Sequence, residues 1–290
     1  MDYLIRALAL DEQVRIYLVT NKDVVNDAIK KHDLWPSAAS VLGKTLTMGL
    51  ILGGMLKGDE GITIKMNGNG PIGNVIVDGN AHGEVRGYAD HPHVNFVFNN
   101  GGLDDASTLG IDGYMDIIKD LRLKELFTSS ISLSGNIAND FTYYFLESEQ
   151  THSAVSLGVL IDVDNTCKVS GGMVFQLLPG ASEKTISTLE RKLKEVDSMS
   201  KLLTKYSPEE ILKILFEKDH RILSKQNVYF KCNCSKEGFS KSLITLGKKE
   251  LQDLLTKEEE IETVCHYCNE KYYFNNEEIK QLIKESENDK

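Results

Sequence analysis

Four of the five cysteines lie in two close pairs near the C-terminus. Cys232 and Cys234 form a Cys-x-Cys pair, and Cys265 and Cys268 form a Cys-x-x-Cys pair thirty residues further on. Zinc binds four soft ligands in a tetrahedron, and two close pairs, each on a tight turn, provide this geometry. His266 lies inside the second turn and is not expected to be a ligand, because four thiolates already fill a structural site. We therefore expect one structural zinc ion per chain, in a C-terminal module of roughly 60 residues.

Two other interpretations of these cysteines are open. A thiol oxidoreductase would use one pair as a thioredoxin-like redox motif, but that motif normally begins a helix after a strand in a β-α-β unit, a context not indicated here. A zinc-ribbon nucleic-acid module would need a basic, aromatic face, for which the candidates are Lys231, Lys236, Lys271, Tyr272 and Tyr273. The formal net charge of −10 argues against nucleic-acid binding.

Residues 1–180 predict a β-rich α+β domain. Apolar side chains alternate with period two, as in half-buried strands, over residues 14–18, 62–66, 94–98, 141–145, 155–161 and 173–177. A helix is expected from Pro36 to about Leu52, ended by two glycines. Trp35 is expected to pack in the core, and Cys167, in an apolar strand, to be a small buried hydrophobe.

The composition and the periodicity both change near Gly180. Residues 1–180 carry 13 basic and 22 acidic side chains, whereas the shorter segment 181–290 carries 20 and 21. Narrow apolar stripes at helical spacing, with a capping box at Ser207–Glu210, predict two charged helices that are marginal unless they dock on another surface. The stripes contain Ile186, Leu189, Leu193 and Val196, then Ile211, Leu212 and Leu215. We expect a helical linker over residues 181–226 and the zinc-binding domain over residues 227–290.

Other motifs do not indicate catalysis. Residues 68–73 match GxGxxG, but a strand and not a helix is expected to follow, so turn formation explains these glycines better than nucleotide binding. His91 and His93 lack further ligands and are expected at a polar strand edge. We find no catalytic constellation and expect a non-enzyme. The uncharged segment 45–56 is too short to span a membrane and no signal peptide is evident, so we expect a cytoplasmic protein.

The cysteine pattern at the end of a chain of this size resembles the redox-regulated 33-kilodalton chaperonin family of bacteria, which are heat-shock holdases. Residues 68–88, 148–150 and 171–180 are similar to that family too, so the resemblance covers essentially the whole chain. The cysteine pattern is its most specific part, and the four ligand positions show no departure from it.

The resemblance implies a switch that responds to oxidative stress. Zinc keeps the reduced protein folded and inactive, with the linker docked on the N-terminal domain. Oxidation releases zinc, pairs Cys232 with Cys234 and Cys265 with Cys268, and unfolds the module and the linker. The exposed surface then holds unfolding client proteins without ATP, and the active form is a homodimer. The candidate client-binding residues are Ile186, Leu189, Leu193, Val196, Ile211 and Leu215.

Overall fold

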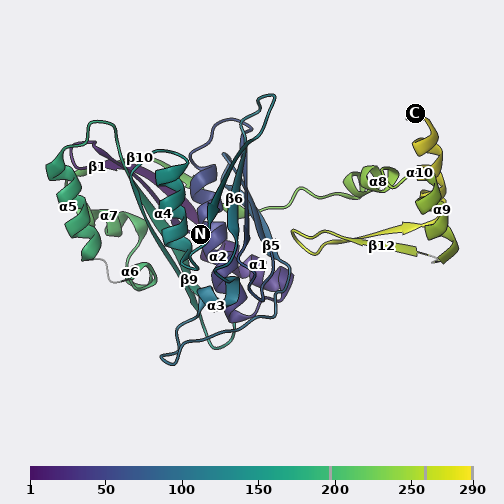
Figure 1. The fold of residues 1–290 in the computed structure, drawn as a ribbon, viewed down its shortest axis with the longest axis horizontal. Coiled ribbons are helices and arrows are strands. Elements are labelled where there is room, and N and C mark those ends of the chain that lie inside the picture. Colours follow the sequence, from purple (N-terminus) through teal and green to yellow (C-terminus); the bar gives the residue numbers. More distant parts are fainter. Residues whose placement is uncertain (196–197, 258–259, 289–290) are drawn as a thin grey trace. The chain divides into compact units, whose positions relative to one another are not determined.

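The computed structural model describes residues 1–195, 198–257 and 260–288. They form two compact units, Met1–Lys231 and Cys232–Lys290. Figure 1 shows the β-rich first unit and the small second unit with its helices and one β-hairpin. The expected α+β fold, with a β-rich N-terminal region and a small cysteine-containing C-terminal region, is confirmed.

The first unit contains a five-stranded antiparallel sheet, in which both faces of the central strands are buried. Its order is β10–β1–β2–β9–β8, formed by His220–Asn227, Tyr3–Ala9, Val14–Thr20, Cys167–Leu177 and Ser153–Ile161. Leu4 and Val19 belong to one core cluster, whereas their neighbours Ile5 and Leu18 belong to another. Successive side chains of a strand point to opposite faces, so this sheet is covered on both sides.

The first unit also contains a six-stranded sheet. Its order is β11–β5–β4–β3–β6–β7, formed by Tyr229–Phe230, Glu84–Ala89, Val75–Asn80, Gly61–Asn67, Tyr114–Asp120 and Phe127–Ser132. The glycine-rich residues 68–73 connect β3 to β4, without the helix that a dinucleotide site needs at that point. A Cβ atom on Gly68 would lie 2.4 Å from the carbonyl oxygen of Gly110, and one on Gly70 would lie 2.3 Å from the carbonyl carbon of Leu109, so close backbone approach explains these two glycines. Gly73 has a φ of +72°, which a turn requires.

Helix α2, Pro36–Gly53, lies between the two sheets and contacts strands of both. Every residue of this helix except Pro36 and Lys44 is buried. The hydroxyls of Thr45 and Thr47 donate to carbonyl oxygens one turn earlier, both at 2.8 Å, and are thereby satisfied inside the core. The predicted helix is confirmed. Among the described residues, no helix combines the length and apolar character that crossing a membrane requires.

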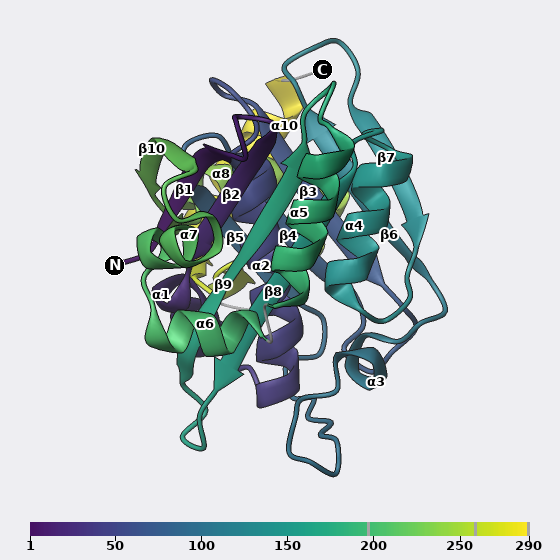
Figure 2. The same ribbon diagram turned by 90° about the vertical axis from the view of Figure 1, so that its left-hand side faces the viewer.

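Six further helices among the described residues of the first unit pack on α2 or on the faces of the sheets. Helices α1 (Lys22–His32) and α3 (Asp105–Leu109) pack on α2, and α4 (Ile137–Glu147) packs on β8 and β7. Helices α5 (Glu183–Lys194), α6 (Met199–Lys205) and α7 (Pro208–Phe216) contribute to the core on the other face of the five-stranded sheet. Figure 2 shows α6 and α7 in front of strands β1, β2 and β9.

The contact between these last helices and the sheet is apolar. Its buried residues include Ile5, Ile16, Leu18, Met173 and Phe175 of the sheet and Leu189, Met199, Ile211, Leu212, Leu215 and Phe216 of the helices. The predicted capping box begins α7: the Glu210 N–H donates to Ser207 Oγ at 3.4 Å, and Glu210 Oε2 accepts from the Ser207 N–H at 2.8 Å. Residues 220–226, at the end of the segment expected to be helical, lie in the strand β10 (His220–Asn227) instead. The division at residues 180 and 226 stays a prediction.

One predicted strand is a helix. Residues 141–145 lie in α4, which begins after Asn136, whose side chain accepts a hydrogen bond from the Asn139 N–H at 3.1 Å. Phe141, Tyr144 and Phe145 are buried at helical spacing, whereas Tyr143 is 49% exposed. The alternation of Phe141, Tyr143 and Phe145 was therefore coincidental.

Two expectations about residues 35–98 are also wrong. Residues 94–98 form a loop with one isolated bridge, between Val97 and Leu103, and not a strand. Trp35 is 48% exposed and packs on the ring of His93, with 5.3 Å between the ring centroids, instead of joining the core.

The second unit is small. It consists of α8 (Lys236–Ile244), α9 (Lys248–Lys257), the hairpin β12 (Glu260–Val264) and β13 (Lys271–Asn275), and α10 (Asn276–Asn288). Its buried core consists of Leu243, Leu251, Ile261, Phe274, Ile279 and Leu282. A core of this size supplies little stability alone, so the unit is of the kind that a bound metal commonly stabilises.

Candidate metal centre

Two tight backbone segments bring the cysteines together. Cys232 and Cys234 precede α8, which Ser235 caps by accepting a hydrogen bond from the Gly238 N–H at 3.1 Å. Cys265 and Cys268 lie in the turn between β12 and β13. In this turn the Asn269 N–H donates to the Cys265 carbonyl oxygen at 2.8 Å, and Asn269 adopts a left-handed conformation.

The four sulfur atoms are arranged as a metal site and not as disulfides. All four lie within 4.8 Å of one another, and no other group of this kind occurs among the described residues. The Sγ atoms of Cys232 and Cys265 are 3.7 Å apart, and those of Cys234 and Cys268 are 3.4 Å apart. A tetrahedron with zinc–sulfur bonds of about 2.3 Å has edges of about 3.8 Å, whereas a disulfide bond is about 2.05 Å long.

The chemistry of the donors fits zinc. Burial raises the pKa of the Cys265 and Cys268 thiols, so a cation is needed to keep these sulfurs as thiolates at neutral pH. Four sulfur donors without carboxylates suit a soft ion such as zinc and not calcium or magnesium. The four cysteines, which we call the four-cysteine site, therefore form a centre that can hold a metal ion.

Tyr272 is a residue of this centre that the sequence analysis did not assign to it. Its hydroxyl donates to the Cys234 carbonyl oxygen at 3.1 Å and lies 3.2 Å from the Cys234 sulfur. The contact with Cys234 raises the pKa of the Tyr272 phenol. Tyr272 shares a strand face with the buried Phe274, so period-two spacing was the available signal. It orients Cys234 in the way that outer partners orient metal ligands.

The lysines weighed for a nucleic-acid face are paired with glutamates. Lys236 Nζ lies 2.5 Å from Glu278 and Lys271 Nζ lies 3.0 Å from Glu262. Lys231 forms an ion pair with Glu84. Much of the positive charge that a phosphate backbone would need is therefore already compensated.

The remaining cysteine and histidine candidates lie elsewhere. Cys167 is 1% exposed, and burial raises its pKa to about 12, so it is a buried apolar side chain as expected. His93 Nε2 lies 2.9 Å from an Asp33 carboxylate oxygen. Neither His91 nor His93 belongs to a metal-binding group among the described residues.

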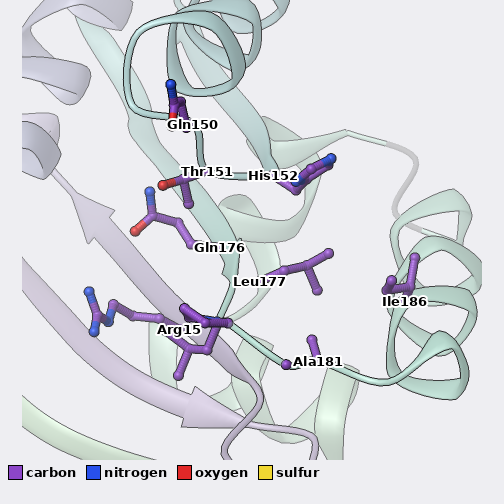
Figure 3. Close-up of a pocket in the computed structure, with 11 residues that line it drawn as sticks. Arg15, Gln150, Thr151, His152, Gln176, Leu177, Ala181 and Ile186 are labelled. Carbon is purple, nitrogen blue, oxygen red and sulfur yellow. The ribbon is translucent and has the colours of Figure 1, made fainter.

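The candidate client-binding residues are covered to different extents. Leu189, Ile211 and Leu215 are buried, Leu193 packs partly buried against the same core, and Val196 lies outside the described residues. Ile186 is half-buried and lines a pocket of about 580 Å³ where β9 leads into α5. Figure 3 shows Ile186 near Leu177 and Ala181 in this pocket.

Comparisons with known proteins agree with one another. The family described as Hsp33 protein matches residues 2–275. A 33 kDa chaperonin of Bacillus velezensis is 46% identical over 289 residues, covering 99% of both chains. One of Bacillus subtilis is 45% identical over 285 residues, covering 97% of this chain and 98% of its own. The crystal structure of a 33 kDa chaperonin (heat shock protein 33 homolog) from Thermotoga maritima matches with a TM-score of 0.91 and 32% identity, covering 99% of both chains.

Proposed function

The chain belongs to the Hsp33 family, and on this premise we propose that it is an ATP-independent holdase chaperone controlled by the four-cysteine site. The reduced protein holds one zinc ion and is inactive, and oxidation releases the zinc and activates the protein. The observation that carries the proposal is the set of four thiols within 4.8 Å of one another. Four thiolates bind zinc tightly, and the same sulfurs joined as disulfides no longer do so.

A bound zinc ion would keep the four sulfurs as thiolates and add folding free energy to the second unit. Cys232 and Cys234 open that unit, and Cys265 and Cys268 lie on its hairpin. The four-cysteine site therefore connects the first residues of the unit to the hairpin β12–β13, the only hairpin that the described residues of this unit form. When this connection is lost, the stability of the unit depends on a core of only six buried apolar residues, which favours unfolding.

Oxidation converts the thiols of the four-cysteine site to disulfides. Two thiols give up two protons and two electrons to hydrogen peroxide, which becomes two water molecules, and one disulfide forms. The sulfurs of Cys232 and Cys265 are 3.7 Å apart and those of Cys234 and Cys268 are 3.4 Å apart, but every pairing lies within 4.8 Å. The family resemblance favours the pairs Cys232–Cys234 and Cys265–Cys268, which we propose.

We propose that residues 181–226 are the linker and that its apolar residues bind clients. In the resting protein, Leu189, Ile211 and Leu215 are buried against the five-stranded sheet. Burying each such side chain contributes about 1.5–3 kcal/mol, offset by the entropy lost in ordering the helix. Release of α5–α7 uncovers the helix stripes and the sheet face below them. An exposed apolar surface of this kind can bind an unfolding protein.

The chain itself couples the linker to the metal centre. Strands β10 and β11 follow the linker helices, and the Lys231 N–H then donates to the Val85 carbonyl oxygen at 2.9 Å. The next residue is Cys232, the first residue of the four-cysteine site. An unfolded second unit therefore adds a flexible chain directly after β11, a strand of only two residues, and weakens the attachment of β10.

We also propose a cytoplasmic location, homodimerisation of the active form, and the absence of enzymatic activity. Nucleic-acid binding is disfavoured because Lys231, Lys236 and Lys271 pair with glutamates. RNA binding that weakens steeply with salt would support that alternative, and turnover of insulin disulfides would support an oxidoreductase.

The experiment compares aggregation of a chemically unfolded enzyme in the presence of the reduced, zinc-loaded protein and of the peroxide-treated protein, without nucleotide. Only the oxidised protein should suppress light scattering. The variant Cys167→Ser is the matched control and should behave as the unmodified chain, because Cys167 lies outside the four-cysteine site. Equal activity in both redox states would refute the switch.

A further inference from the structure

Strand β10 is an edge strand that buries almost nothing. None of its eight residues, all of which the structure describes, is buried, and Ile222 and Leu223 are 41% and 48% exposed. Its neighbour β1 is the opposite, since Leu4, Ile5 and Ala7 are at most 1% exposed. Figure 2 shows β10 at the edge of the sheet beside β1. The main chain, more than the side chains, must hold β10 in place.

The side chains of β10 form hydrogen bonds and ion pairs with neighbouring elements. Arg6 Nη2 donates to Gln226 Oε1 at 3.0 Å, and Arg221 forms an exposed ion pair with Glu12. Lys225 pairs with Glu209, which belongs to the linker helix α7. Exposed ion pairs contribute little to stability, and the last of these pairs depends on α7 remaining docked. Strand β10 therefore belongs to the least stable part of the first unit.

We propose that β1 becomes a binding site for extended segments of client proteins once β10 has left it. The inference rests on the proposed function, because oxidation must first loosen the linker. A client segment would pair antiparallel with β1 in place of β10. An open sheet edge offers a row of main-chain donors and acceptors that accepts many sequences. The apolar residues on both sides of β1 favour clients that carry exposed apolar segments.

In the resting protein, the edge of β1 is already paired with a strand of the same chain, β10, which shows the kind of segment that can pair there. It pairs with residues Tyr3–Ala9, with one irregularity between Arg6 and Ala7. At one end of the ladder the Val228 N–H donates to the Asp2 carbonyl oxygen at 3.2 Å. Alternate residues of an antiparallel strand point their main-chain groups at the same neighbour. The N–H groups of Ser224 and Gln226 therefore point at β1, and those of Lys225 and Asn227 point away.

This alternation provides a test with a matched control. The probe is a fluorescent synthetic peptide with the sequence of residues 220–227, added to the full-length oxidised protein. It should bind the oxidised protein and not the reduced one, and it should compete with an unfolded client. N-methylation at Ser224 and Gln226 should weaken binding at least about tenfold, because two main-chain hydrogen bonds are lost. N-methylation at Lys225 and Asn227 keeps every side chain and should leave binding nearly unchanged.

Hydrogen exchange of the same oxidised protein gives a second readout. The amides of Leu4 and Arg6 should lose protection on oxidation and regain it when a client binds. The inference is overturned if β1 stays protected while the oxidised protein suppresses aggregation, or if both methylated peptides bind equally well. The proposed function would survive either result. An oxidised protein that suppresses no aggregation would instead refute the proposed function itself.

Discussion

Replacing Ile211 by alanine should undock the linker helices without touching the metal centre. Ile211 is fully buried in the cluster that α5–α7 share with the five-stranded sheet. A buried isoleucine replaced by alanine typically costs about 2–5 kcal/mol. Ile214 lies on the same helix and is 51% exposed. The variant Ile214→Ala is therefore a matched control, with the same chemical change at a side chain that is only half-buried.

Native-state hydrogen exchange of the reduced, zinc-loaded protein measures the effect. A loss of about 2 kcal/mol in docking raises the open population about thirtyfold, so amides of residues 181–226 should exchange at least that much faster in Ile211→Ala. Amides of β3 and β4 should be unaffected, because those strands belong to the other sheet. The reduced variant should also suppress some aggregation before any oxidation.

The result that would refute this reasoning is equal behaviour of the two variants. If Ile211→Ala and Ile214→Ala exchange at the same rate, burial on the sheet does not hold the linker. If Ile211→Ala undocks the helices but the reduced protein stays inactive, the covered surface does not bind clients.

Three further outcomes are expected. Serine at any one position of the four-cysteine site should abolish stoichiometric zinc binding in a metal assay, whereas Cys167→Ser should retain one zinc per chain. Tyr272→Phe removes the hydroxyl beside Cys234 and should speed zinc transfer to a chelator about tenfold or more; an unchanged rate would mean that Tyr272 does not support the site. Burial raises the pKa of Asp2 to about 6, although the hydrogen bond from the Val24 N–H opposes this shift. The folded state therefore binds a proton at Asp2 more tightly than the unfolded state does. This proton stabilises the folded state at low pH, and the stabilisation is lost as pH rises through about 6. Asp2→Asn should therefore gain stability relative to the unmodified chain between pH 5 and pH 7 in urea unfolding, and parallel pH profiles would contradict this.

The sequence predicted the elements whose signals are local. The cysteine spacing predicted the four-cysteine site, which can hold a metal ion, and the proline start and glycine end of α2 predicted that helix. The capping box at Ser207 was predicted because its hydrogen bonds join residues three apart. Each of these features depends on neighbours along the chain and hardly at all on distant contacts.

The failures occurred where tertiary contacts decide the structure. Aromatic residues at 141–145 fit two periods, and packing on β8 and β7 selects the helix. Strand β10 has too few buried residues to show an alternating pattern, and pairing with β1, more than 200 residues away in the chain, fixes it. The role of Tyr272 depends on a contact with Cys234, which lies 38 residues away in the chain.

Time-resolved hydrogen exchange during peroxide treatment, with zinc release followed in the same samples, tests the central claim most directly. The account predicts that zinc release coincides with loss of protection from Cys232 onward, that residues 181–226 lose protection next, and that the strands of residues 1–180 other than β1 remain protected. A linker that stays as protected after complete zinc release as before it would contradict the account.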